Sequence, residues 1–381
     1  MMMTLFLLLI ALFVPVSTSS AQPEPVDCPL PPYQLPLEVP PRSFFDSAGN
    51  LVINGTDSAF DVPEGFTVRH HIWSDDGELM LVTVTSADFD SRVLVYRDGA
   101  QSEVLGADDL LALRNEEFRD AVTLYNPAFV PGTHTVLFNT ELLSDAEGIY
   151  VEVPLDLWSL DLDTGEVSEI LPYGEAGQFE IAPDGQSIVL LGNGYIRQIN
   201  IDSSDPRDLF EGTVAIGLGH GLGYPDFVWD NDAEISTFRV LLFPTYDPNS
   251  SGLYVPFEVR EFVLGETPES RMILEGPSIF IPSAWLSPDG TRVAYWTWQD
   301  NTVADVFDVV VVSPDAEPLL LASVETPGGG ISPLVRWSDE THLVYGYTDA
   351  NNDNTVTSWM ADLCGEITAL EPYPANVPGM Q

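Results

Sequence analysis

A short turn motif that recurs six times is the feature that most constrains how this chain can fold. Each copy begins with a bulky apolar residue, enters a turn rich in Ser, Pro, Asp and Gly, and leads into an apolar run. The copies lie about 50 residues apart, which indicates one supersecondary unit used six times. They are residues 73–77 (WSDDG), 128–132 (AFVPG), 181–185 (IAPDG) and 286–290 (LSPDG), with degenerate copies at 229–233 (WDNDA) and 337–341 (WSDET).

The chemistry of this turn predicts a tight connection between two β-strands. Proline presets the backbone for an early turn position, Asp or Asn accepts hydrogen bonds from the following backbone, and Gly accepts positive φ. Runs rich in Val, Ile, Tyr, Trp and Thr follow each turn, and the segment before it supplies a further strand. Four short strands per repeat predict an all-β protein, a six-bladed β-propeller of four-stranded antiparallel blades. An array of immunoglobulin-type sandwiches is the alternative, although each unit would need about a hundred residues.

Two segments depart from the strand pattern. Residues 107–120 (ADDLLALRNEEFRD) combine helix-forming residues with acidic residues at the start and apolar contacts at Leu110, Leu111, Leu113 and Phe118. We expect a short helical insertion here, between the first two repeats. The glycine-rich segment 217–223 lacks the Gly-x-Gly-x-x-Gly spacing of dinucleotide-binding turns, and we expect a flexible loop between blades.

The chain is expected to divide into four segments: a signal peptide at residues 1–21, a proline-rich N-terminal arm at 22–60, the propeller at 61–371 and a C-terminal tail at 372–381. The first apolar run has roughly 11 residues, whereas a bilayer span takes about 20, and Ser19 and Ala21 fit a cleavage site. A membrane anchor is the alternative, because no Lys or Arg precedes the run. Cleavage would leave no membrane span, so we expect a secreted, periplasmic or cell-surface protein.

The charge of the chain excludes several classes of function. Fifty-nine acidic residues face 13 basic ones, for a formal net charge of −46. Such a surface repels phosphate backbones, so we expect no nucleic-acid partner. All the basic residues are Arg, which excludes a Schiff-base lysine and a phosphate-loop lysine.

The two cysteines, Cys28 and Cys364, lie near opposite ends of the expected mature chain. In an oxidising compartment an even pair predicts a disulfide. That bond would fasten the N-terminal arm to the last repeat. Two free thiols are the alternative.

Three stretches of the sequence resemble the TolB-type, WD-repeat-like propellers of bacteria: residues 286–295 (LSPDGTRVAY), 181–190 (IAPDGQSIVL) and 156–166 (DLWSLDLDTGE). The resemblance covers roughly residues 60–371 and implies the propeller fold, which serves many roles. TolB proteins carry an additional N-terminal α/β domain, for which the residues before 60 leave no room. We therefore do not expect the Tol envelope role.

A calcium site is the one cofactor site that the sequence suggests. Asp349, Asn351 and Asp353 alternate as in an EF-hand-like loop, and Thr355 offers a carbonyl oxygen. Met360 stands where such a loop has a bidentate Glu, so a plain polar hairpin loop is the alternative. The sequence has no Gly-x-Ser-x-Gly motif, and its five histidines have no zinc-like spacing.

The function we expect is that of a monomeric binding or scaffolding module for a protein or another extracytoplasmic ligand. Rigid blades hold variable loops on two flat faces, which suits binding. The alternative is a propeller enzyme, a glycoside hydrolase or lyase, with carboxylates in the central channel. It requires two carboxylates in one concave pocket, at least one of them with a perturbed pKa. A structural, calcium-stabilised surface protein is the third hypothesis.

Overall fold

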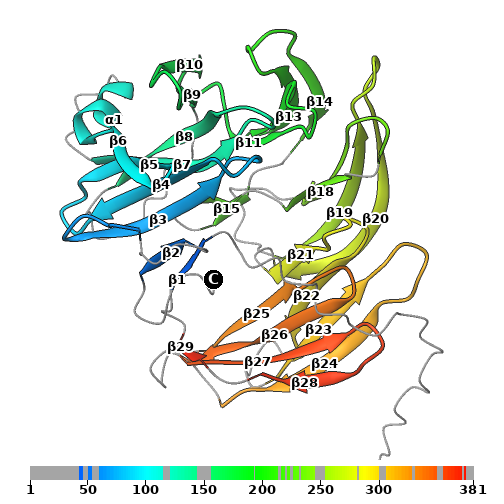
Figure 1. The fold of residues 1–381 in the computed structure, drawn as a ribbon. Coiled ribbons are helices and arrows are strands. Elements are labelled where there is room, and N and C mark those ends of the chain that lie inside the picture. Colours follow the sequence, from blue (N-terminus) through cyan, green and yellow to red (C-terminus); the bar gives the residue numbers. More distant parts are fainter. Residues whose placement is uncertain are drawn as a thin grey trace, which may run out of the picture.

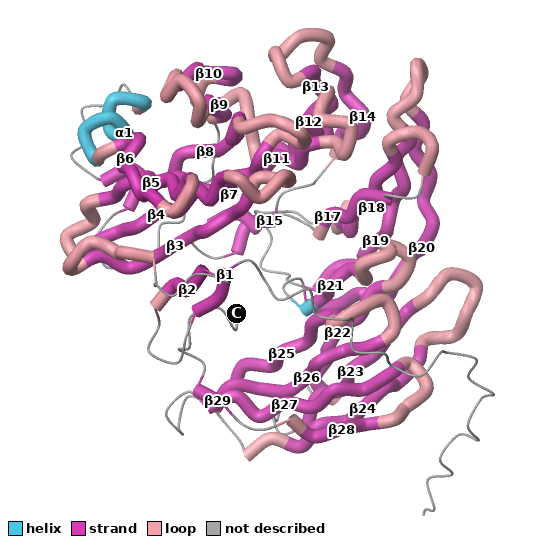
Figure 2. The backbone as a smooth tube through the Cα atoms, in the orientation of Figure 1, coloured by secondary structure: helices cyan, strands magenta, loops and turns pink. Residues whose placement is uncertain are grey.

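The computed structural model describes most of the expected propeller and part of the expected arm. The described residues are 43–45, 50–53, 60–114, 121–143, 156–192, 194–212, 216–218, 221–223, 226–230, 233–244, 254–280, 283–299, 306–327, 331–349, 355–370 and 373–374. Nearly all of their regular structure is β-strand (Figure 2). None of the helices among them has the length and apolar character needed to cross a membrane.

The described residues form six antiparallel sheets of four consecutive strands each, arranged around a common centre (Figure 1). The first strand of each sheet lies nearest the centre and the fourth lies farthest out. This arrangement confirms the predicted six-bladed β-propeller. We number the sheets as blades 1 to 6 in chain order.

The first three blades follow the repeats closely. Blade 1 comprises β3 (Phe66–Trp73), β4 (Leu79–Ser86), β5 (Ser91–Arg97) and β6 (Ala100–Leu105). Blade 2 comprises β7 (Ala121–Phe129), β8 (Thr135–Leu143), β9 (Leu157–Asp161) and β10 (Val167–Leu171). Blade 3 comprises β11 (Gln178–Ile181), β12 (Ser187–Gly192), β13 (Tyr195–Asn200) and β14 (Arg207–Glu211).

The last three blades have the same organisation. Blade 4 comprises β17 (Phe227–Asp230), β18 (Thr237–Leu242), β19 (Tyr254–Val263) and β20 (Glu269–Phe280). Blade 5 comprises β21 (Ala284–Leu286), β22 (Val293–Trp298), β23 (Val306–Val312) and β24 (Leu319–Glu325). Blade 6 comprises β25 (Ile331–Trp337), β26 (His342–Asp349), β27 (Thr355–Asp362) and β28 (Ile367–Ala369), and the short β29 (Tyr373–Pro374) also pairs with β27.

Burial along the strands follows from face-to-face stacking of the blades. The second strands β4 and β12 are buried at nearly every position, whereas β28 at the outer edge is exposed throughout. A strand covered on both faces needs apolar residues at consecutive positions rather than in alternation. The second strands therefore appear in the sequence as short continuous apolar runs.

Apolar clusters of described residues join each pair of consecutive blades. Between blades 1 and 2, for example, Leu81 and Val95 pack with Leu124 and Phe138. Burying one such side chain contributes about 1.5–3 kcal/mol. Among the described residues, the core is thus a series of inter-blade clusters that runs from blade 1 to blade 6.

The end of the expected N-terminal arm belongs to this core. Strands β1 (Ser43–Phe45) and β2 (Leu51–Ile53) form an antiparallel hairpin between blade 1 and blade 6 (Figure 1). Leu51, Ile53 and Phe60 are buried against the face of β4 that points away from blade 2. The hairpin therefore covers the apolar face of blade 1 that no preceding blade covers.

The two expected exceptions to the strand pattern have different outcomes. Helix α1 (Ala107–Leu113) lies beside blade 1 and buries Leu110, so the helical insertion is present but ends before the predicted residue 120; residues 115–120 lie outside the described part. The sequence predicts a flexible loop at 217–223, and this prediction is wrong for the described backbone. Strands β15 (Ile216–Leu218) and β16 (Gly221–Gly223) pair in a hairpin there, because backbone hydrogen bonds need no side chains.

Candidate functional site

The recurring turn has the hydrogen bonds that its residue types predict. In blade 5, the Ser287 hydroxyl donates to Oδ1 of Asp289 at 2.5 Å, and the Thr291 backbone N–H donates to the same oxygen at 3.0 Å. Gly290 closes the turn with φ of +67°, a conformation that favours glycine. The aspartate thus holds the turn between the first and second strands of its blade.

The same turns connect neighbouring blades at one end of the propeller. Three of the contacts pair a turn with the next turn around the ring, and in the other one Arg239 of β18 reaches the turn of blade 5. The bonds are Gly132 N to Asp75 Oδ2 (3.0 Å), Ser236 Oγ to Asp184 Oδ2 (3.3 Å), Arg239 Nη1 to the Asp289 carbonyl (2.7 Å) and Arg292 Nη1 to the Glu340 carbonyl (3.1 Å). The motif therefore serves both as a strand connection and as a contact between blades.

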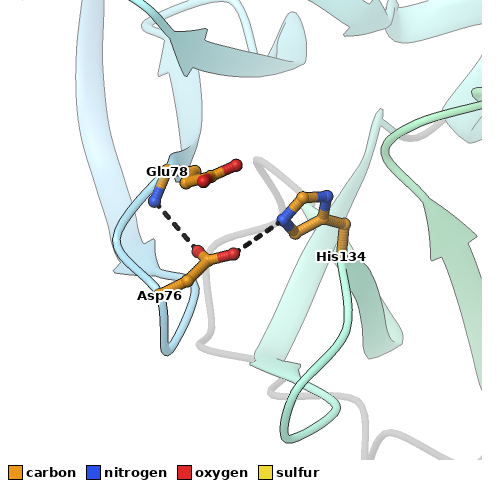
Figure 3. Close-up of side chains that lie close together, drawn as sticks. All are labelled: Asp76, Glu78 and His134. Carbon is orange, nitrogen blue, oxygen red and sulfur yellow. Dashed lines mark hydrogen bonds and ion pairs between the residues drawn. The ribbon is translucent and has the colours of Figure 1, made fainter.

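One of these contacts contains a histidine between two carboxylates. His134 lies between β7 and β8 of blade 2, and its Nε2 atom is 3.1 Å from Oδ2 of Asp76 in the β3–β4 turn of blade 1 (Figure 3). Its Nδ1 atom is 3.0 Å from Oδ2 of Asp163 in the β9–β10 turn. Arg97 of blade 1 donates to Asp163 at 2.5 Å. We call Asp76, Glu78, His134 and Asp163 the blade 1–2 histidine cluster.

The hydrogen bonds in this cluster favour the charged forms of His134 and Asp76. Hydrogen bonding to Asp76, and then to Asp163, raises the pKa of His134. The backbone N–H of Glu78, followed by the Ser74 hydroxyl and His134, lowers the pKa of Asp76 to about 2. The side chain of Glu78 lies nearby, and one ligand atom from each of Asp76, Glu78 and His134 lies within 4.8 Å of the others. These three residues could hold a metal ion.

A second candidate site is a cavity of about 230 Å³ at the outer rim of blade 2. It lies between the end of α1 and the outer strands β9 and β10. The lining residues combine aromatic, charged and apolar side chains: Leu113, Arg114, Asp156, Trp158, Glu169, Pro172 and Tyr173.

A buried Arg–Asp pair organises this cavity. The guanidinium of Arg114 lies 3.9 Å from Asp156 and 4.8 Å from the centre of the Tyr173 ring. Asp156 accepts hydrogen bonds from the backbone N–H of Thr140 at 2.8 Å, from the Thr140 hydroxyl and from the Trp158 indole N–H at 3.1 Å. Buried charges need such partners. Asp156 therefore holds Arg114 and Trp158 in place, while Tyr173 remains 45% exposed.

A cavity of about 310 Å³ lies on the other side of β10. Pro172 lines both cavities, and Ile170 and Leu171 of β10 form part of the second wall. Arg197 and Glu175 supply charged groups there. We call the two cavities together the blade-2 rim.

Carboxyl groups with raised pKa values occur elsewhere in the propeller. Burial raises the pKa of Glu180 on β11 to about 7, and it also raises the pKa values of Glu141 on β8 and Asp226 before β17. Arg69 lies 3.6 Å from Glu141, and the Leu286 backbone N–H donates to Asp226 at 2.8 Å. These three carboxyl groups line neither cavity of the blade-2 rim.

The residues predicted to bind calcium lie at the connection between β26 and β27. Asp349 ends β26, Thr355 begins β27, and the two are partners across the antiparallel ladder. Asn351 and Asp353 lie outside the described residues. The hairpin is therefore present, and the calcium site stays a prediction.

Cys364 lies in the turn between β27 and β28, where its backbone N–H donates to Oδ1 of Asp362 at 3.0 Å. Cys28 lies outside the described residues, so its predicted pairing with Cys364 stays a prediction.

Comparison with known proteins adds distant likenesses to solved structures. No family model and no curated protein matches the chain. An oligogalacturonate lyase in complex with manganese is similar over 80% of this chain and 74% of its own, with 16% identity and a TM-score of 0.46. A prolyl endopeptidase is similar over 86% of this chain and 46% of its own, with 14% identity and a TM-score of 0.49. The β-propeller domain of the Trilobed protease from Pyrococcus furiosus is similar over 81% and 84%, with 11% identity and a TM-score of 0.43. Likenesses this distant carry no statement about activity, and the chain is a β-propeller on the evidence of its own six sheets.

Proposed function

We propose that the chain is an exported, acidic, TolB-type propeller that binds a protein or another extracytoplasmic ligand at the blade-2 rim. The observation that carries this proposal is the pair of cavities on either side of β10. Partly exposed aromatic rings beside a fixed guanidinium are typical of binding surfaces, because aromatic and Arg side chains give large contact energies. Tyr173 and Arg114 provide this combination.

The chemistry of the rim supports binding rather than turnover. Asp156 is buried and accepts hydrogen bonds from Thr140 and Trp158, so its oxygens are occupied by structural partners. The carboxyl groups whose pKa values burial raises lie away from these cavities. A monomer that presents a rigid rim to its ligand is the form we propose, with calcium at Asp349 as an additional stabilising ion.

The test compares two tyrosine variants of the mature protein. Tyr173→Ala removes the exposed ring at the rim, and Tyr254→Ala removes a ring of similar exposure (50%) on blade 4. Each protein is immobilised and exposed to extracts of the cell envelope and to soluble glycans. We expect at least one ligand that wild type and Tyr254→Ala retain equally and Tyr173→Ala loses. Equal retention by all three proteins would refute the rim as the binding site.

An enzyme is the second candidate, and Glu180 is the observation that favours it. A carboxyl group with a pKa of about 7 is suited to general acid–base chemistry near neutral pH. The test is incubation with neutral and acidic polysaccharides, followed by assays for reducing ends and for unsaturated products. Turnover that Glu180→Gln abolishes would establish catalysis and displace the binding proposal.

A further inference from the structure

We propose that Asp76, Glu78 and His134 of the blade 1–2 histidine cluster bind one divalent transition-metal ion, with Zn²⁺ as the best fit. The proposed site is separate from the blade-2 rim and does not depend on the function proposed there. Mixed imidazole and carboxylate ligands are typical of zinc sites. Asp76 and Glu78 come from the turn of blade 1, whereas His134 comes from blade 2.

The spacing of two ligand atoms already suits an ion. Zinc binds nitrogen and oxygen ligands at about 2.0–2.2 Å, which places neighbouring ligand atoms about 3–3.6 Å apart. The His134 Nε2 and Asp76 Oδ2 atoms are 3.1 Å apart. Figure 3 shows the imidazole and the Asp76 carboxylate pointing toward each other, with the Glu78 side chain beside them. Glu78 is exposed, so rotation of its side chain can bring its carboxylate to the same point.

Asp163 positions the imidazole for this role. Without an ion, both ring nitrogens of His134 can donate, Nε2 to Asp76 and Nδ1 to Asp163. An ion at the site would displace the Nε2 proton, and the bond from Nδ1 to Asp163 would keep the tautomer whose Nε2 lone pair faces that ion. A carboxylate behind a metal-binding histidine is a recurrent arrangement that orients the ring and strengthens it as a ligand. Arg97 in turn holds Asp163 at 2.5 Å.

The two oxygens of Asp76 have different partners. Oδ1 accepts hydrogen bonds from the Ser74 hydroxyl at 2.6 Å and from the Glu78 backbone N–H at 2.9 Å. Oδ2 faces His134. The first oxygen therefore fixes the carboxylate to the turn, and the second remains directed at the proposed ion.

A bound ion would join the turns of blades 1 and 2. It would bind the folded protein and not the unfolded chain, so it would stabilise the propeller by an amount that grows with the logarithm of its concentration over its dissociation constant. An acidic protein also attracts divalent cations through its overall field, so the decisive comparison is between variants that differ by one local group.

The experiment titrates the chelator-treated mature protein with Zn²⁺, and separately with Mn²⁺, by calorimetry. Glu78→Gln and His134→Gln each remove a ligand, and Asp163→Asn removes the positioning carboxylate. Asp208→Asn is the matched control, because Asp208 is likewise an exposed acid paired with an arginine, Arg197, but it lies on blade 3. Circular dichroism checks that every variant is folded.

We expect one Zn²⁺ site per chain in wild type and in Asp208→Asn, and its loss in His134→Gln. Asp163→Asn should weaken the affinity by about 10–100-fold. If His134→Gln fails to fold, Glu78→Gln gives the decisive result, since no hydrogen bond described above uses its carboxylate. Equal Zn²⁺ affinity and stoichiometry in wild type, Glu78→Gln and Asp208→Asn would overturn the proposal, as would a preference for Mn²⁺ that none of these substitutions alters.

Discussion

The indole N–H of Trp73 at the end of β3 donates a hydrogen bond to the hydroxyl of Ser43 in β1 at 2.9 Å. This bond ties the N-terminal hairpin to the first strand of blade 1, thirty residues along the chain. Together with the buried side chains of β2, it makes a segment outside the repeats part of the propeller core.

Leu51→Ala tests the contribution of this hairpin. Leu51 is fully buried against β4, so its truncation should lower the free energy of unfolding by about 2–5 kcal/mol. Urea denaturation followed by tryptophan fluorescence measures the loss. Ile367→Ala, at a position that is 50% exposed, is the control and should change stability by much less. Equal losses would mean that the hairpin does not stabilise the propeller.

The glycines that close the recurring turns should differ in their sensitivity to substitution. Gly132 has φ of +70° and nothing within 4 Å of an added Cβ, so Gly132→Ala should cost about 1 kcal/mol from backbone conformation alone. At Gly290 an added Cβ would come within 2.8 Å of the Arg239 side chain, which donates to the Asp289 carbonyl. Gly290→Ala should therefore cost more than Gly132→Ala in thermal denaturation. The reverse order would show that the Arg239 contact adjusts freely.

Glu180 should make stability depend on pH. Its folded pKa of about 7 lies above the ordinary value of 4.5, so the stability it contributes is complete below about pH 4.5 and is lost as the pH rises through 7. Glu180→Gln removes this loss. Between pH 4.5 and pH 8, the free energy of unfolding of the variant should therefore rise relative to that of wild type by up to about 3 kcal/mol, reduced by solvent screening. Denaturation at several pH values measures the difference. Glu211→Gln, at an exposed position on β14, controls for the amide, and a pH-independent difference for Glu180→Gln would contradict the prediction.

The predicted Cys28–Cys364 disulfide should stabilise the folded chain. A disulfide typically contributes about 2–4 kcal/mol. Cys364→Ser, and reduction of the wild type, should each lower the melting temperature, and reduction should have no further effect on the variant. Labelling of two thiols in the native, unreduced protein would contradict the predicted bond.

The repeats made the fold predictable because their information is local. In residues 286–290, the apolar anchor, the aspartate and the closing glycine specify one turn, and the strands on either side follow from short apolar runs. Six such units bury their faces only when they are stacked in a ring. The β1–β2 hairpin lies outside the repeats, so nothing local indicated that Leu51 would fill the last open face.

The candidate sites were harder to predict because their residues meet across blades. His134 and Asp76 lie 58 positions apart, and His134 and Asp163 lie 29 apart, so no spacing rule joins them. A usable signal was the histidine two residues after the turn of residues 128–132, since that turn neighbours the Asp-rich turn of the previous repeat. The blade-2 rim depends on the position of Arg114 after a helix that ends earlier than its sequence suggests.

Every blade is a continuous stretch of chain, with blade 1 at residues 66–105 and blade 6 beginning at 331. In the described sheets, no strand from one end of the chain completes a sheet at the other end. No shared ladder of backbone bonds thus joins the first and last blades in the described sheets, and the hairpin that packs on blade 1 lies between them. A ring built in this way has a seam, and thermal opening should begin there and leave the individual sheets intact.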